Sequence, residues 1–369
     1  MRMMFVMLGV YIALNAWVCW LVVRSLAGLP LVVRILAGLL FLALAFAFPL
    51  FEFAHRRIPM SLTQAGYWIA TGWPTFVFYT AIAYAVLWLL CRLGLPLLDA
   101  VPWARIATAA GLAAAVLICG YVNFTIPAVR EITVDLSAGA ANPRTIRVAA
   151  VSDLHLGYGI TRERLEGWVR RINEGAPEAV LVSGDLIDMA MRPLDETQMD
   201  EALRGLRAPK GVWMAPGNHE HYSGLAGAAD FAKRSNIRLL IDEAEELAPG
   251  LTIVGRDDRR NPARSAPAAL LDRVPEGNAV VVLDHQPHAV DVERTAAAAP
   301  AGRTFAFYGH THDGQVWPFN HVLGLFGLLP TGMNKVGGID AFVSSGLGLW
   351  GGPFRVATTG EILFITIRW

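Results

Sequence analysis

Histidine, aspartate and asparagine residues gather in five short clusters after residue 150. The clusters are Asp153-Leu154-His155, Gly184-Asp185, Gly217-Asn218-His219-Glu220, Asp284-His285 and Gly309-His310-Thr311-His312. Oxygen donors from Asp and Asn, combined with imidazole nitrogens, suit borderline divalent metals such as Mn²⁺, Fe²⁺ or Zn²⁺. All three cysteines precede residue 120, so thiolate ligands are excluded. The sequence therefore predicts a metal centre built from nitrogen and oxygen donors.

Two of these clusters pair ligand types at a spacing of two residues. In extended backbone, Asp153 with His155 and His310 with His312 would each project to one side of the chain. Two converging pairs predict two ions. A lone histidine at a strand end is more often a solvated loop residue, but five of the nine histidines fall in these clusters.

Short apolar or β-branched runs stand in front of the clusters and predict the strands that position them. The runs are Ile146–Val151, Ala179–Ser183, Val212–Ala215, Leu251–Val254, Ala279–Leu283 and Thr304–Tyr308. A helical pattern covers Arg162–Asn173 between the first two. This alternation indicates an α/β domain, in which loops at the carboxyl ends of strands converge on one edge of the sheet.

The order D-x-H, GD, GNH, H and GHTH resembles that of the calcineurin-like metallophosphoesterases. The stretches Gly217–Gly224, His310–Gln315 and Ser345–Gly348 resemble the membrane-associated bacterial branch, which is similar to UDP-diacylglucosamine pyrophosphatases. The match runs from about Arg147 to the C-terminus. It implies an α/β fold, a four-layer αββα sandwich, preceded here by an all-α transmembrane region of about four helices.

The resemblance also implies the ligand sets. One metal would be held by Asp153, His155, Asp185 and His312. The second would be held by Asp185, Asn218, His285 and His310, so that the Asp185 carboxylate bridges the two ions. The implied cofactors are two divalent ions, with manganese favoured over iron or zinc. The sequence departs from the family pattern at Asp284, Asp313 and Thr359-Gly360. None of these departures replaces a residue of the implied ligand sets.

The expected reaction is hydrolysis of a phosphoester by a hydroxide that two ions share and aim at phosphorus. His219 is the candidate general acid for the leaving group, since it adjoins the ligand Asn218, and Asp153 is expected to orient it. His219 as a purely structural residue beside the metals is the alternative. Possible substrate contacts are His221, Tyr222, Arg256 and Arg355.

The sequence before residue 129 has the composition of a membrane region. It contains seven arginines, two acidic residues and no lysine, a net charge of +5, so the remainder carries −5. Charge-free runs at Met3–Val23, Ile35–Phe51, Ile58–Cys91 and Ile106–Val129 predict four spans, the third within Trp73–Leu90. A cleaved signal peptide is the alternative for the first run.

These runs give a predicted domain organisation. Residues 1–129 form the transmembrane region, 130–144 a linker and 145–369 the catalytic domain. We expect a multi-pass protein of the cell (inner) membrane. The arginines are shared equally between the two faces, so orientation stays open, with the cytoplasmic face favoured if the substrate is nucleotide-linked.

The expected partners are the lipid bilayer and a phosphorylated, lipid-linked substrate such as UDP-diacylglucosamine, cleaved at a phosphodiester or pyrophosphate. Nucleic acid is excluded because the soluble part has no basic excess. The run Val316–Pro330 has no acidic or basic side chain other than His321. If exposed, it would meet the membrane interface or an acyl chain, and otherwise it packs in the core. The alternatives are a soluble substrate, a non-catalytic metal-bearing scaffold, and a channel or transporter formed by the helices. The oligomeric state is not predicted.

Overall fold

The computed structural model describes residues 2–55, 57–95, 101 and 103–369. The chain divides into two compact units. The first, the helical unit, comprises Met1–Asn123 together with Gly351–Val356. The second, the sandwich unit, comprises Phe124–Trp350 and Ala357–Trp369. The division falls six residues before the predicted boundary at residue 129, and a short segment near the C-terminus belongs with the helices.

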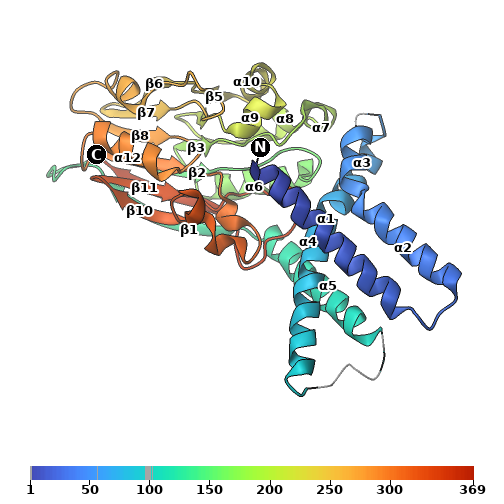
Figure 1. Ribbon diagram of the computed structural model, residues 1–369. Helices are drawn as coiled ribbons and strands as arrows, with labels where there is room; N and C mark the ends of the chain where they lie inside the picture. Colours follow the sequence, from blue (N-terminus) through green and yellow to red (C-terminus); the bar gives the residue numbers. More distant parts are fainter. Residues whose placement is uncertain (1, 56, 96–100, 102) are drawn as a thin grey trace. The chain divides into compact units, whose positions relative to one another are not determined.

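Five helices form the N-terminal part of the helical unit (Figure 1): α1 (Arg2–Ser25), α2 (Leu31–Ala45), α3 (Ala47–Ala54), α4 (Met60–Arg92) and α5 (Ala104–Thr125). Within the described residues, α1, α4 and α5 are long and apolar enough to cross a membrane. They confirm three of the four predicted spans. Helix α4 has 33 residues and extends well beyond the Trp73–Leu90 span assigned to it.

The second predicted span is wrong as a continuous helix. The chain leaves helical geometry at Phe46, where φ is −91° and ψ is 1°, so that α2 has only 15 residues and α3 has eight. Pro49 accounts for this break, because a proline inside a helix clashes with the carbonyl four residues earlier, here that of Ala45. The break places Pro49 in the first turn of α3, where no helical N–H is needed.

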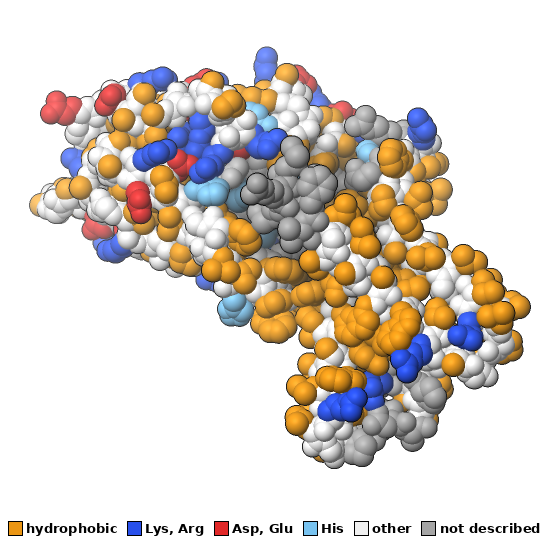
Figure 2. Space-filling view, viewed as in Figure 1, with side chains coloured by type: hydrophobic (Ala, Val, Ile, Leu, Met, Phe, Trp, Pro, Cys, Tyr) orange, Lys and Arg blue, Asp and Glu red, His pale blue; other side chains and the backbone are white. Residues whose placement is uncertain are grey.

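The interior of the helical unit is apolar with a few paired polar groups. The side chains of Val18, Phe41 and Val77 are buried against one another from α1, α2 and α4. The indole of Trp73 donates to Asn15 Oδ1 at 2.9 Å. Hydrophobic side chains make up most of the face of this unit that Figure 2 shows, as expected for helices that meet lipid.

The sandwich unit contains two six-stranded sheets (Figure 1). The first has the order β1 (Ala128–Asp135), β12 (Glu361–Arg368), β2 (Thr145–Val151), β3 (Ala179–Ser183), β4 (Val212–Ala215), β5 (Ile237–Leu239). The second has the order β10 (Gly332–Val336), β11 (Ile339–Val343), β9 (Thr304–Tyr308), β8 (Ala279–Leu283), β7 (Leu251–Gly255), β6 (Glu243–Ala248). All six strands predicted from the sequence are present.

Strand β1 corrects the predicted linker at 130–144. It pairs in parallel with β12 along its whole length, from Ala128 opposite Glu361 to Asp135 opposite Arg368. The sequence AVREITVD hides this strand, because an edge strand buries few side chains and here only Val134 is fully buried. The connection from the membrane helices to the sandwich is therefore part of a sheet.

The two sheets pack face to face, since side chains of alternating strand positions point to opposite faces. Val148 and Ala150 of β2 meet Val281 and Leu283 of β8 in the core between the sheets. Helices cover the outer faces: α6 (Arg162–Glu174), α7 (Met191–Glu196), α8 (Met199–Leu203), α9 (Asn218–Ser223) and α10 (Leu225–Arg234) accompany the first sheet, and α11 (Pro267–Leu271) and α12 (Ala289–Ala298) the second. The predicted four-layer αββα sandwich is confirmed.

Helix α6 shows how the sequence produces one outer layer. Thr161 caps its N-terminus by accepting from the Arg164 N–H at 3.3 Å. Leu165, Trp168 and Ile172 lie on one face at helical spacing and are buried on the sheet. Three short 3₁₀ turns, η1 (His312–Gly314), η2 (Phe319–His321) and η3 (Leu323–Phe326), complete the connection between β9 and β10.

Candidate metal centre

The seven predicted metal ligands come together at one edge of the sandwich. They follow the carboxyl ends of β2, β3, β4, β8 and β9. Strands β2, β3 and β4 are parallel within one sheet, and β8 and β9 within the other, so their ends can converge. Three overlapping groups have ligand atoms within 4.8 Å of one another: Asp153, His155 and His312; His155, Asp185 and His219; Asp185, His285 and His310.

In the first group two imidazole nitrogens face each other. Nε2 of His155 lies 3.0 Å from Nε2 of His312. Oδ1 of Asp153 is 3.4 Å from the His312 nitrogen and 3.9 Å from the His155 nitrogen. All three side chains are buried. Two ring nitrogens and a carboxylate that share one buried point form a donor set that fits a divalent cation.

The group that contains His285 and His310 shares Asp185 with the group that contains His155 and His219. Oδ2 of Asp185 is 3.0 Å from Nε2 of His285 and 3.7 Å from Nε2 of His155. Asn218 is buried, and its side-chain oxygen has no hydrogen-bond partner within the described part of the chain. A buried amide oxygen without a partner is costly unless a ligand takes it. These residues fit a second cation, with Asp185 between the two groups.

Five of the seven ligands have a left-handed backbone. The φ angle is 56° at Asp153, 46° at His155, 51° at Asp185, 72° at His310 and 49° at His312. The prediction that each i, i+2 pair converges from extended backbone is therefore wrong, although the side chains do converge. Positive φ is sparsely populated for residues other than glycine and is concentrated at functional sites.

Two glycines allow the ligand loops to approach closely. A Cβ on Gly184, whose φ is 77°, would stand 2.6 Å from Nδ1 of His285. One on Gly217 would stand 2.6 Å from the backbone nitrogen of Asp185. The glycines of the GD and GNH clusters are thus required by the packing of the metal ligands.

Glu220 fastens two of the ligand loops together. Its carboxylate is completely buried and accepts from the backbone N–H groups of Asp185 at 2.9 Å, Gly217 at 2.7 Å and Ile187 at 3.0 Å. The sequence analysis quoted Glu220 within the GNH cluster without a role for it. Three donated hydrogen bonds give it one, since they fix the loops that carry Asp185 and Asn218.

Asp188 was missed in the sequence, and it replaces Asp153 as the residue that orients His219. Nδ1 of His219 lies 2.5 Å from the Asp188 carbonyl and 3.4 Å from its carboxylate, which is also 3.5 Å from Nδ1 of His155. Asp153 instead accepts from the His310 N–H at 3.0 Å. The available signal was a second acid three residues after Asp185.

Charges around His219 favour its protonated form. Burial lowers the pKa of His219, but the carboxylates of Asp188 and Asp185 outweigh burial and raise it to about 9. Burial likewise opposes charge on Asp188, yet hydrogen bonds from His155 and His219 lower the pKa of that carboxyl to about 2. The pair is therefore an imidazolium held by a carboxylate at neutral pH.

The other ligand histidines differ in charge. Burial and the neighbouring His285 lower the pKa of His310 to about 3, which keeps its ring neutral and its lone pair free to bind a metal. Nδ1 of His285 lies 2.8 Å from the Ser183 carbonyl, which can only accept, so Nδ1 carries a proton. That hydrogen bond directs Nε2 of His285 toward Asp185.

Two predicted substrate contacts lie beside His219 on α9. Nε2 of His221 is 2.9 Å from Oδ1 of Asp257, so this ring is tied to the loop after β7. The Tyr222 ring packs edge-on to His219 with centroids 5.2 Å apart, and it remains about half exposed. The Arg260 guanidinium lies 4.9 Å from the Tyr222 ring. Substrate contact by His221 and Tyr222 stays a prediction.

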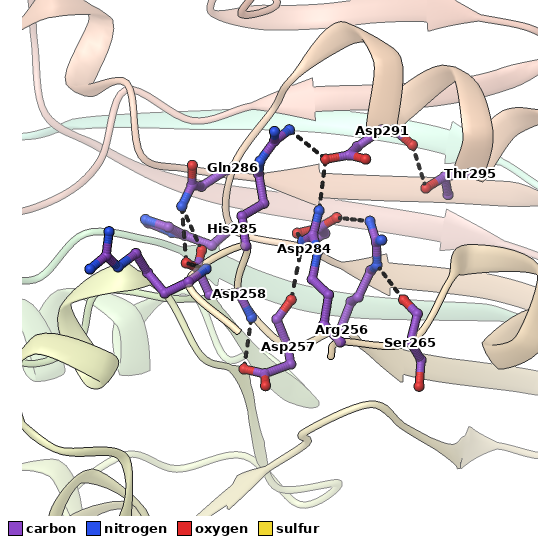
Figure 3. Close-up of polar contacts among 12 residues, drawn as sticks. Arg256, Asp257, Asp258, Ser265, Asp284, His285, Gln286, Asp291 and Thr295 are labelled. Carbon is purple, nitrogen blue, oxygen red and sulfur yellow. Dashed lines mark hydrogen bonds and ion pairs between the residues drawn. The ribbon is translucent and has the colours of Figure 1, made fainter. Parts of the chain in front are cut away.

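Arg256, a predicted substrate contact, pairs with a buried acid, and its contact with substrate stays a prediction. It is buried, and it donates to Asp284 Oδ2 at 3.1 Å and to the Ser265 carbonyl at 3.1 Å (Figure 3). Arg264 also approaches Asp284, at 3.4 Å. Asp284 is therefore neutralised by arginines instead of adding negative charge to the metal site, and Arg256 is engaged in that pairing.

Arg355, the other predicted arginine, lies in a different unit of the chain from the ligands. It is completely buried and belongs to the Gly351–Val356 segment of the helical unit. Its backbone N–H donates to the Gly120 carbonyl at 3.0 Å, and its carbonyl accepts from Asn123 at 2.9 Å. The predicted phosphate contact of Arg355 stays a prediction.

A family comparison agrees with this site. Residues 146–314 match the family described as calcineurin-like phosphoesterases, and this range contains all seven ligands, His219 and Asp188. The chain carries a calcineurin-like metallophosphoesterase domain. Strand β1 and the strands from β10 onward lie outside the matched range and complete the two sheets of the sandwich unit.

Relatives of the metallophosphoesterase domain occur in bacteria and animals. The chain is 29% identical over 230 residues to a metallophosphoesterase of Aquifex aeolicus, covering 60% of this chain and 85% of that protein. It is 27% identical over 230 residues to one from Helicobacter pylori, covering 61% and 60%. A transmembrane protein with metallophosphoesterase domain from Danio rerio is 27% identical over 238 residues, covering 60% and 53%.

The comparisons extend over only part of several relatives. The chain spans 53% of the length of a Caenorhabditis elegans relative and 60% of the Helicobacter pylori and Campylobacter jejuni proteins. The apolar helices and the relatives with transmembrane regions indicate a membrane protein.

Proposed function

We propose that the protein is a membrane-anchored, dinuclear-metal phosphoester hydrolase. The observation that carries this proposal is the position of Asp185, whose carboxylate lies between two buried groups of ligands. One ion would be held by Asp153, His155, Asp185 and His312. The other ion would be held by Asp185, Asn218, His285 and His310. We further propose manganese as the ion, with iron or zinc as alternatives that the same donor set accepts.

When bound, two divalent ions supply Lewis-acid stabilisation of the phosphoryl charge and activation of the attacking water. Residues of the protein itself supply the proton that the leaving group needs. Asp188 holds Nδ1 of His219, which leaves Nε2 of the imidazolium to give a proton to the departing oxygen. We also propose that Tyr222 contacts the leaving group, which its packing on His219 and its half-exposed ring support.

We propose that the substrate is lipid-linked, with a phosphodiester or pyrophosphate as the scissile group. The segment from Val316 to Pro330 follows the ligand His312 and is largely exposed. Its large apolar side chains show 42% exposure at Trp317, 46% at Phe319, 82% at Leu325 and 49% at Phe326. The core-packed alternative from the sequence is not supported for these four side chains, and exposed apolar residues beside a site favour contact with lipid.

A membrane anchor favours the same class of substrate. A catalytic domain tethered to a bilayer meets a substrate confined to that bilayer at a high effective concentration. A nucleotide-linked lipid would be met on the cytoplasmic face of the inner membrane, which is the orientation we propose. Protease protection of the metallophosphoesterase domain in sealed inverted vesicles would contradict that orientation, and cleavage would support it.

The substrate class is tested with the full-length protein in mixed micelles. One substrate is a diacylated pyrophosphate and the other its short-chain soluble analogue. Replacing Leu325 and Phe326 with serine should lower kcat/KM for the diacylated substrate about tenfold or more and leave the soluble one unchanged, because removing two exposed apolar anchors weakens only lipid contact. Val290→Ser, at another exposed apolar side chain, is the matched control.

Two outcomes would favour a different function. Equal efficiency on both substrates, unchanged by the Leu325 and Phe326 replacements, favours a phosphatase or phosphodiesterase of soluble substrates. No turnover of any phosphoester in the presence of Mn²⁺, Fe²⁺ or Zn²⁺ favours a non-catalytic metal-bearing scaffold.

A further inference from the structure

The loop that follows β7 carries four arginines between residues 256 and 264. Three of them form ion pairs with buried acids: Arg256 with Asp284 at 3.1 Å, Arg259 with Asp291 at 2.6 Å and Arg264 with Asp291 at 2.7 Å. The fourth, Arg260, is exposed, and no carboxylate in the described part of the chain forms an ion pair with it. The loop therefore presents one positive charge that the described acids leave unpaired.

The contact that the Arg260 side chain does make lies beside the candidate metal centre. Its guanidinium carbon is 4.9 Å from the centroid of the Tyr222 ring. The same ring packs edge-on to His219, with centroids 5.2 Å apart. A cation beside an aromatic ring is attracted by the ring and keeps its charge. One ring therefore separates this positive charge from the proposed proton donor.

The backbone at Arg260 is attached to the loop of a proposed metal ligand. The Arg260 N–H donates to Oδ1 of the buried Asp258 at 2.8 Å. The side-chain amide of Gln286 donates to the same carboxylate, at 3.0 Å to Oδ1 and 2.8 Å to Oδ2 (Figure 3). Gln286 directly follows His285 in the sequence. Buried hydrogen bonds therefore fix where Arg260 leaves the loop.

A second attachment joins the same loop to α9, which carries both His219 and Tyr222. Oδ1 of the buried Asp257 lies 2.9 Å from Nε2 of His221 on that helix. Its Oδ2 accepts from the side-chain amide of Asn261 at 2.8 Å. The two aromatic rings and Arg260 are therefore held on elements that are hydrogen-bonded to each other.

The charge of the leaving group distinguishes the two scissile groups proposed above. Cleavage of a pyrophosphate breaks the bond from one phosphorus to the bridging oxygen and releases a phosphate monoester, which is an anion. A simple phosphodiester releases a neutral alcohol. In both reactions water supplies the hydroxide that joins phosphorus and loses its other proton to solvent, while the leaving oxygen takes the proton of His219, which solvent restores. A fixed cation on this side favours the anionic leaving group.

We propose that Arg260 binds the leaving-group phosphate of a pyrophosphate and makes the protein prefer pyrophosphates to simple phosphodiesters. This inference rests on the proposed hydrolase function and narrows its substrate class. The planar guanidinium can donate two parallel hydrogen bonds to a phosphate, which a surface charge at a greater distance does not do.

The test compares two short-chain soluble substrates, dibutyl pyrophosphate and butyl 4-nitrophenyl phosphate, with the full-length protein and Mn²⁺. Both present a butyl phosphoryl group to attack and both have weakly basic leaving groups, but only the first leaving group is charged in the substrate. Arg260→Gln should lower kcat/KM for the pyrophosphate about tenfold or more and change that for the diester less than about twofold. Arg260→Lys, which keeps the charge without the planar fork, should retain more of the preference than Arg260→Gln.

Arg259→Gln is the matched control, since Arg259 is the preceding residue, is exposed, and is paired with Asp291. It should leave the ratio of the two kcat/KM values unchanged, and all three variants should melt near the wild-type temperature. Equal losses on both substrates in Arg260→Gln, or no loss on either, would overturn the role of Arg260 while leaving the hydrolase function in place. The same change of ratio in Arg259→Gln would reduce the effect to the general charge of the loop and would also overturn it. Failure of the unaltered protein to cleave either substrate would instead contradict the hydrolase function, and this inference with it.

Discussion

Nδ1 of His219 lies 2.5 Å from the carbonyl oxygen of Asp188 and 3.4 Å from its carboxylate. A carbonyl can only accept, so Nδ1 carries a proton and the ring is fixed with Nε2 free. The same carboxylate lies 3.5 Å from the ligand His155. Asp188 therefore links the proton donor of the proposed reaction to one of the proposed metal ligands.

The pairing of His219 with Asp188 gives the metal-free protein a pH dependence. The pKa of His219 rises from 6.5 to about 9, so this stabilisation is complete below pH 6.5 and is lost as pH rises through 9. His285, whose pKa is also raised by Asp185, acts in the same direction. The melting temperature of EDTA-treated protein should fall between pH 6.5 and 9.

Asp188→Asn should make that fall shallower, because His219 loses the larger part of what raises its pKa, while the effect of Asp185 on His219 and the His285 part remain. Asp195→Asn, at a carboxylate on the surface, is the control and should leave the slope unchanged. An equally steep fall in Asp188→Asn would contradict the role of Asp188 in holding the His219 imidazolium.

His219→Ala should lower turnover most for substrates with poor leaving groups. General-acid assistance is worth about 10² to 10⁴ in rate, and an activated aryl phosphate needs little of it. The measurement is kcat on an alkyl and an aryl phosphodiester at saturating Mn²⁺, with metal content checked for each protein. Equal losses on both substrates would assign His219 a structural or metal-organising role.

Glu220→Gln should destabilise the metallophosphoesterase domain. Its buried carboxylate accepts three backbone N–H groups, and an amide would turn a donor toward at least one of them. The expected loss is about 1–3 kcal/mol per unsatisfied group, visible as a lower melting temperature of the metal-free protein. Glu246→Gln, at an exposed strand position, is the comparison. Unchanged stability in Glu220→Gln would show that the loops are held by other contacts.

The sequence predicted a cluster of nitrogen and oxygen donors because metal chemistry restricts residue types and parallel strands bring their carboxyl ends together, whereas the two ligand sets came from the family resemblance. It could not show Asp188, since one more acid in a loop has no distinctive pattern. Nor could it show that Arg256 is neutralised by Asp284, because such pairs depend on long-range packing. Strand β1 escaped prediction because it is an edge strand with few buried side chains.

In the membrane region, too, the sequence predicted some elements and missed others. Hydropathy predicted α1, α4 and α5, whose composition decides their structure. It failed at the second run, where Pro49 breaks the helix at Phe46 and hydropathy alone carries no such signal. The inclusion of Gly351–Val356 in the helical unit depends on contacts with α4 and α5, and no local pattern predicts it.

Metal stoichiometry and turnover of Asp185→Asn test the two-metal assignment most directly. Asp185 lies between both ligand groups, so its replacement should lower the bound metal from about two ions to one or fewer. It should also reduce turnover of a phosphodiester at least about 10³-fold, while Asp195→Asn stays near wild type. Mass spectrometry of the metal content and a thermal melt would be made on the same samples. Two tightly bound ions and full turnover in a folded Asp185→Asn protein would contradict the assignment.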